Sequence, residues 1–357
     1  MNEFAIHVPQ SGLDDLHERL ARTRWPDELP GAGWDYGIPL GRMRDLTTAW
    51  EKLDWRAHEE RLNAYPQFVD EIDGENVYFL HIRSASADAI PLILTHGWPG
   101  SVVEFLDLIP LLTDHFHLVI PAIPGYGFSG PTRSRGWGQQ RVAQAWATLM
   151  ARLGYDRYGA QGGDWGSGIS RLLAAAAPGH VIGAHINFMP TMGTPDGPLS
   201  EVDAARLAKT RALAANRHPH QILFAAAPQT IAYALNDSPV GQLAFIAEKF
   251  TQWADPDRPV PDEVIVTDVM HYWITGTAGS SSRLIKESGL TAGPIPCPVP
   301  LGVAVLPHDI VQPVRPLVEP RHDIRQWTEF PRGGHFAALE VPELLAADVT
   351  TFFEGLR

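Results

Sequence analysis

The stretch from Gln161 to Ser167 carries the residues best arranged for chemistry. It has the spacing Gly-x-nucleophile-x-Gly, in which small residues let a strand turn sharply into a helix and expose the central side chain. Asp164 occupies the nucleophile position. A carboxylate that attacks a saturated carbon forms an ester, which water can then hydrolyse at its carbonyl, so this aspartate predicts epoxide opening or halide displacement. Taken alone, the same residues also fit a turn in which Asp164 is only a helix N-cap.

Two later residues complete a catalytic order. Asp309 follows the predicted strand 302–306, and His335 follows the last predicted strand, near 327–330. Nucleophile, acid and histidine in this order are typical of the α/β-hydrolase fold, in which the histidine activates water and the acid orients the imidazole. A single histidine beside two glycines would more often be structural. Three residues in this order, each at a strand end, favour a catalytic triad.

The segment from His96 to Pro99 adds an independent signal. It follows a predicted strand, and the α/β-hydrolase fold takes one oxyanion-hole N–H from this loop and another from the residue after the nucleophile. The backbone N–H groups of Trp98 and Trp165 are therefore the predicted oxyanion hole.

Alternating strands and helices position these residues. The alternation begins at Pro91 and predicts a mostly parallel sheet covered by helices on both faces, with the active site at the carboxyl ends of the strands. It is lost after Ile186, where helices and loops predict a helical lid. The predicted parts are a wrapping N-terminal extension, the first part of the core, the lid and the second part of the core, at 1–82, 83–190, 191–291 and 292–357.

The composition limits the possible partners. The chain has 357 residues, 45% of them hydrophobic, and a formal net charge of -13 with a pI near 5.5, which disfavours nucleic acid and anionic membranes as partners. No segment is apolar for long enough to span a bilayer. The single Cys297 cannot form an intramolecular disulfide, so a cytoplasmic location is expected. We expect no metal and no organic cofactor, and a homo-oligomer remains open.

Motifs spread over nearly the whole chain resemble those of the microsomal-type epoxide hydrolases, including their bacterial soluble members. This resemblance implies an α/β-hydrolase core with the family's N-terminal domain, catalysis by Asp164, Asp309 and His335, and a small apolar or aromatic epoxide as substrate. The motifs are Thr23-Arg24-Trp25-Pro26-Asp27, Asp54-Trp55-Arg56, the segment from His96 to Ser101, the segment from Gly162 to Gly166, Asp237-Ser238-Pro239, and the segment from Arg332 to Ala338.

The lid departs from the family at two positions. The family polarises the epoxide oxygen with two lid tyrosines, and alignment on its motifs puts His220 and Ile285 in their places. Isoleucine cannot donate a proton, so we expect poor activity on simple unactivated epoxides. His220 and Tyr272 are the candidate replacement donors in the lid.

Two other functions stay open at this point. A haloalkane dehalogenase could use the same aspartate, with the indole N–H of Trp165 beside the leaving halide. A catalytically silent scaffold could have kept the fold without turnover, although the complete triad argues against it.

Overall fold

The computed structural model describes residues 1–216, 218–289 and 295–357. The predicted boundary between the lid and the second part of the core, at 291/292, lies outside the described residues. Within these ranges, no helix combines the length and apolar character needed to cross a bilayer.

A nine-stranded sheet forms the centre of the core, in the order β1-β2-β3-β5-β4-β6-β7-β8-β9. Every pairing from β5 to β9 is parallel, and the pairings that join β1, β2, β3 and β5 are antiparallel. The predicted α/β-hydrolase core with a mostly parallel sheet is confirmed. The strands are β1 (Asn2–Phe4), β2 (Gln67–Ile72), β3 (Glu75–Ile82), β4 (Ile90–Thr95), β5 (Phe116–Pro121), β6 (Tyr158–Gly162), β7 (Val181–Ile186), β8 (Leu301–Val305) and β9 (Ile324–Glu329).

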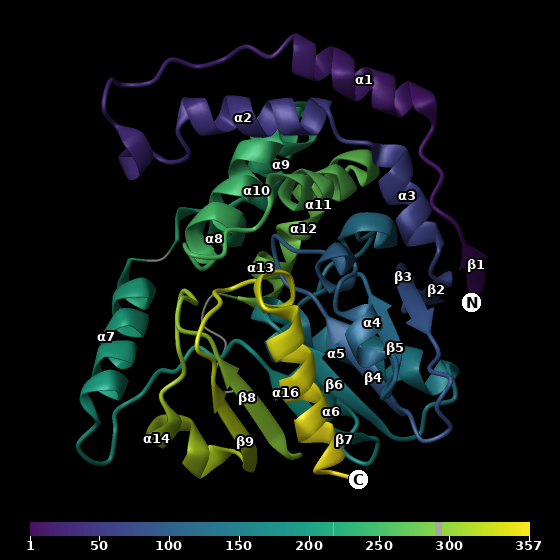
Figure 1. Ribbon diagram of the computed structural model, residues 1–357, viewed down its shortest axis with the longest axis vertical. Coiled ribbons are helices and arrows are strands. Elements are labelled where there is room, and N and C mark those ends of the chain that lie inside the picture. The colour runs from purple at the N-terminus through teal and green to yellow at the C-terminus, as the bar shows by residue number, and fades with distance from the viewer. Residues whose placement is uncertain (217, 290–294) are drawn as a thin grey trace.

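Helices cover both faces of the sheet (Figure 1). The longest of them bury one apolar face, as in α5, where Val142, Trp146 and Leu149 recur at helical spacing and are fully buried. Helices α4 and α16 contact each other on one face, and α5 and α6 do so on the other. The core helices are η2 (Val102–Phe105), α4 (Ile109–Leu112), η3 (Gly127–Ser129), α5 (Gln139–Arg152), α6 (Asp164–Ala176), α14 (Arg315–Val318), η4 (Glu319–Arg321), α15 (Ala337–Glu340) and α16 (Pro342–Glu354).

The described part of the segment between β7 and β8 contains helices and no strand, which confirms the predicted helical lid. Most of these helices form a cluster at one end of the sheet, while α7 lies apart from the cluster along the side of the core (Figure 1). Lys209 on α7 donates a hydrogen bond to the backbone carbonyl of Asp309. The lid helices are α7 (Glu201–Ala215), α8 (Pro219–Ala226), α9 (Pro228–Asp237), α10 (Pro239–Trp253), α11 (Asp262–Thr275), α12 (Ala278–Ser281) and α13 (Arg283–Ser288).

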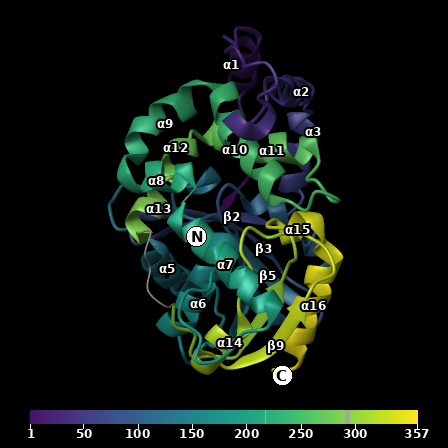
Figure 2. The same ribbon diagram turned by 90° about the vertical axis from the view of Figure 1, so that its left-hand side faces the viewer.

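The N-terminal extension lies over the lid and also lengthens the sheet. Its helices are α1 (Gln10–Ala21), η1 (Gly33–Tyr36), α2 (Leu40–Glu51) and α3 (Trp55–Asn63). Helix α2 packs on α10 and α11, and Figure 2 shows α1 to α3 at the same end of the molecule as these lid helices. The Trp50 indole donates to the Met270 sulfur, and Arg42 forms two hydrogen bonds with Asp262, at 2.8 and 2.6 Å. The extension therefore holds the lid in place over the core.

Candidate active site

The turn between β6 and α6 holds Asp164 in a strained conformation. Its φ of 45° is positive, which is uncommon for a residue with a side chain and marks a site where strain is maintained by its surroundings. The flanking glycines make the turn sterically possible. A Cβ at Gly166 would lie 1.9 Å from the Thr95 carbonyl oxygen, and one at Gly162 would lie 2.5 Å from the Gly166 backbone. This is the geometry of a nucleophile elbow.

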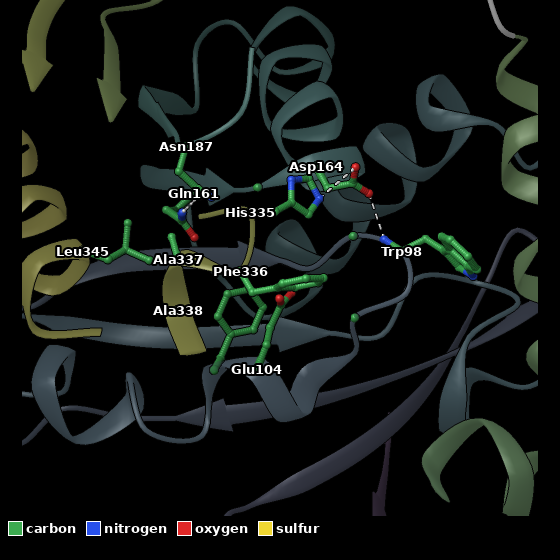
Figure 3. Close-up of a pocket in the computed structure, with 14 residues that line it drawn as sticks. Trp98, Glu104, Gln161, Asp164, Asn187, His335, Phe336, Ala337, Ala338 and Leu345 are labelled. Carbon is green, nitrogen blue, oxygen red and sulfur yellow. Dashed lines mark hydrogen bonds and ion pairs between the residues drawn. The ribbon is translucent and has the colours of Figure 1, made fainter. Parts of the chain in front are cut away.

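The structure brings the three predicted triad side chains together. His335 Nδ1 lies 2.8 Å from Asp309 Oδ1, and His335 Nε2 lies 3.5 Å from Asp164 Oδ2 (Figure 3). The Ile310 backbone N–H also donates to Asp309 Oδ1, at 2.7 Å. The acid is therefore fixed from two sides, and the imidazole stands between the two carboxylates.

The two carboxylates control the charge of the imidazole. Burial alone would lower the pKa of His335, but the charges and hydrogen bonds of Asp309 and Asp164 outweigh burial and raise this pKa to about 10. Burial raises the pKa of Asp309, and the interaction with His335 opposes that rise. With both carboxylates ionised, His335 is an imidazolium at neutral pH.

The predicted oxyanion loop also contacts the nucleophile. The Trp98 backbone N–H donates to Asp164 Oδ1 at 2.9 Å (Figure 3). This close approach requires Gly97, because a Cβ there would lie 2.4 Å from the Asp164 side chain. Trp165 lies in the first turn of α6, where backbone N–H groups have no acceptor within the helix. Both predicted donors are thus backbone groups beside the carboxyl of Asp164.

The two candidate lid donors differ in how they are engaged. His220 stacks on Trp98, with ring centroids 4.9 Å apart, and its side chain is buried. Burial first, and then Lys249 and His218, lower the pKa of His220 to about 2, so its imidazole is neutral. The Tyr272 hydroxyl donates to the Gly100 carbonyl oxygen at 2.7 Å, and this interaction uses its only proton. Neither side chain is therefore a ready proton donor, because the imidazole of His220 carries no extra proton and the proton of Tyr272 is already engaged.

Ile285 is buried on α13, and its side chain has no proton to donate. The structure does reveal Tyr126, which the sequence argument missed. It lies in the loop after β5, its hydroxyl is buried, and within the described chain this hydroxyl has no hydrogen-bond partner. The signal available in the sequence was its position after a parallel strand, at the same sheet edge as Asp164.

A cavity of about 20 Å³ lies beside the triad (Figure 3). Its polar lining includes Glu104, Gln161 and Asn187, which sequence reasoning also missed. Gln161 immediately precedes the elbow and Asn187 immediately follows β7, so the strand ends were again the available signal. Over the described ranges, no group of three or more His, Cys, Asp or Glu side chains is arranged to hold a metal ion.

Comparison with known proteins identifies the family. The model described as epoxide hydrolase N terminus matches residues 1–105, and the one described as alpha/beta hydrolase fold matches residues 90–196. The chain is 33% identical to epoxide hydrolase 1 of Sus scrofa, over 98% of this chain and 87% of that protein. It is 40% identical to a Stigmatella aurantiaca protein assigned to the epoxide hydrolases, over 99% of this chain and 85% of that protein. The chain belongs to the epoxide hydrolase family.

Solved structures of family members share the whole architecture. The Aspergillus niger epoxide hydrolase has a TM-score of 0.90 at 31% identity, covering 100% of this chain and 96% of its own. The juvenile hormone epoxide hydrolase of Bombyx mori has a TM-score of 0.89 at 30% identity, covering 100% of this chain and 94% of its own. The extension and the lid of this epoxide hydrolase family member are thus parts of the family fold, and the chain is a hydrolytic enzyme.

Proposed function

We propose that this enzyme hydrolyses epoxides to diols through an ester on Asp164. The observation that carries the proposal is the arrangement of His335 between Asp164 and Asp309, at 3.5 and 2.8 Å, on a strained elbow. In the first step, a carboxylate oxygen of Asp164 attacks an epoxide carbon, the carbon–oxygen bond of the ring breaks, and the released oxygen takes up the proton that His335 gives up when Asp164 loses its charge. The product is a hydroxyalkyl ester of the enzyme.

Hydrolysis of the ester is the second step. Water attacks the carbonyl carbon of Asp164 while His335 Nε2 accepts its proton, and Asp309 stabilises the imidazolium that forms. The oxyanion of the tetrahedral intermediate accepts hydrogen bonds from the backbone N–H groups of Trp98 and Trp165. The intermediate then breaks its bond to the diol oxygen, which receives the proton from His335.

The substrate is proposed to carry an apolar or aromatic group. Support comes from the aromatic side chains that surround Trp98, whose ring packs edge-on against both Phe224 and Phe245, at 5.2 and 6.0 Å between ring centroids. Such rings favour apolar and aromatic ligands. Because His220 is neutral, the substrate should also stabilise its own leaving oxygen, for example by conjugation at the epoxide carbon.

Oxygen labelling tests the covalent step. In a single turnover in ¹⁸O-labelled water, one labelled oxygen should enter the carboxylate of Asp164, because water attacks the ester carbonyl and not the substrate. Mass spectrometry of the peptide that contains Asp164 measures the label. Label found only in the diol would mean that water opens the epoxide directly.

The variant His335→Gln tests the second step. It should still be alkylated but should not hydrolyse the ester, so a stable mass increase equal to the substrate should appear on Asp164. Absence of this adduct, when the parent enzyme turns over, would contradict the role of His335 as the base. Turnover of a chloroalkane with halide release would instead favour a dehalogenase, and absence of both adduct and turnover would favour a silent scaffold.

A further inference from the structure

The residues that line the cavity beside the triad all belong to the core. Its walls are the loop from Gly97 to Phe105, the strand end from Gln161 to Asp164, Asn187, the segment from His335 to Ala338, and Leu345. Its volume of about 20 Å³ exceeds the roughly 10–15 Å³ that one water molecule requires. An epoxide with an apolar substituent is too large for it. The space therefore suits water as its occupant.

One wall presents an acceptor that lacks a donor. Gln161 is only 1% exposed, and its Nε2 donates to Asn187 Oδ1 at 2.9 Å, which fixes the orientation of its amide. Its Oε1 is buried and has no hydrogen-bond partner among the described residues. A buried carbonyl oxygen of this kind costs free energy unless it accepts a hydrogen bond. The cavity is where such a donor can bind.

His335 also lines this cavity, and its imidazole has a nitrogen that makes no hydrogen bond within the described chain. His335 Nε2 is buried, makes no hydrogen bond within the described chain, and has Asp164 Oδ2 as its ion-pair partner at 3.5 Å. Figure 3 shows His335 directed at Asp164, with Gln161 and Asn187 lining the same pocket. A water molecule here is within reach of both the base and the carboxyl that becomes the ester.

Glu104 adds a third polar group from η2. Its carboxyl lies against the loop of Trp98, where a Cβ at Gly100 would be 3.1 Å from Glu104 Oε2. Burial and the charges of Asp268 and Asp164 raise the pKa of Glu104 to about 8, against the opposing effect of His335. Glu104 is thus a neutral carboxylic acid at pH 7 and can donate a hydrogen bond.

We propose that this cavity binds the hydrolytic water, held by Gln161 Oε1 and the Glu104 carboxyl beside His335 Nε2. One water hydrogen points to Gln161 Oε1 and the other to His335 Nε2, while Glu104 donates to the water oxygen. A lone pair of this oxygen forms the new bond to the Asp164 carbonyl carbon, and the proton on the His335 side moves to Nε2. The inference rests on the proposed ester mechanism and assigns to Gln161 and Glu104 a part in its second step only.

Rapid-quench kinetics with mass detection of the Asp164 ester tests this site. In Gln161→Met and Glu104→Gln, the rate of ester formation should stay within about twofold of the parent. The rate of ester hydrolysis should fall by about 10²-fold, the loss expected when a reacting group is misplaced by about 1 Å. The ester should therefore accumulate in both variants during steady turnover.

Two control variants make the same two substitutions at buried residues outside the cavity. Gln242→Met removes a buried lid glutamine that donates to the Val269 carbonyl, and Glu75→Gln changes a buried glutamate that accepts from the Arg133 and Ser134 backbone N–H groups. Thermal unfolding of all four variants identifies losses of stability. Neither control should change the ratio of ester formation to ester hydrolysis.

The outcomes separate this inference from the proposed function. Ester hydrolysis at the parental rate in either Gln161→Met or Glu104→Gln would overturn the three-point water site. Equal slowing of both steps, or the same change in the controls, would overturn it in favour of a structural role. If neither the parent nor His335→Gln forms an ester during turnover, the proposed function itself fails and the inference fails with it.

Discussion

The charge of Asp164, together with that of Asp309, is predicted to raise the pKa of His335. Two carboxylates flank the imidazole, at 3.5 Å for Asp164 and 2.8 Å for Asp309, and the pKa of His335 is about 10. At an effective dielectric constant of about 20, one unit charge near 4 Å contributes about 4 kcal/mol. Since 1.36 kcal/mol corresponds to a tenfold change in the equilibrium constant, loss of the Asp164 charge should lower the pKa of His335 to about 7.

Asp164→Asn makes this change with almost no change in shape. A ¹⁵N–¹H NMR titration of the histidine side chains measures the result, and His335→Gln identifies the resonance by removing it. In the parent, His335 should remain protonated up to about pH 10, and in Asp164→Asn it should titrate near pH 7. Equal pKa values in the two proteins, or a parental value near 6.5, would refute the electrostatic argument.

This coupling has a consequence for the order of steps. Alkylation removes the charge of Asp164, so His335 can lose a proton and become a base only after the ester has formed. The epoxide oxygen needs one proton in that same step. After hydrolysis, the carboxyl of Asp164 returns a proton to His335. The enzyme therefore completes the cycle without net uptake or release of protons.

Two further predictions concern the lid and its contact with the N-terminal extension. On an aryl epoxide such as styrene oxide, the double variant His220→Tyr with Ile285→Tyr should alkylate about 10²-fold faster than the parent, because a phenol donates to the leaving oxygen; a parent that already matches the double variant would place the donor elsewhere. The second concerns His58, which lies 3.1 Å from His271 between their Nε2 atoms, and whose pKa burial lowers to about 4. Below pH 6.5 the unfolded chain binds a proton that folded His58 does not, so the free energy of unfolding should fall by about 2 kcal/mol between pH 6.5 and 5. Urea unfolding should show this loss reduced in His58→Gln, and an unchanged pH dependence would contradict it.

The sequence by itself determined the nucleophile elbow and the order of the triad residues, because both depend on patterns of residues that are close in the chain. Glycines at fixed spacing define the elbow of Asp164, because a side chain at Gly162 or Gly166 would collide with the backbone. The order of Asp164, Asp309 and His335 along alternating strands and helices predicted the fold and the side of the sheet on which they meet. Both signals depend on neighbours in the chain and on the rules of parallel sheets.

Pairing and burial were decided only by the tertiary structure. The strand β1 has three residues without a pattern and exists because β2 pairs with it. His220 is held neutral by packing on Trp98 and the groups around it, and Tyr272 is engaged by the Gly100 carbonyl. These properties arise from side chains that lie far apart in the chain.

The water cavity is the clearest feature that the sequence alone could not predict. Glu104 and Gln161 stand 57 positions apart, and although Gln161 lies at the end of a strand, nothing in the sequence places it beside Glu104. The packing of η2, β6 and the loop of His335 encloses them around one small space. The desolvation that raises the pKa of Glu104 and leaves Gln161 Oε1 without a donor comes from this enclosure, which only the folded chain creates.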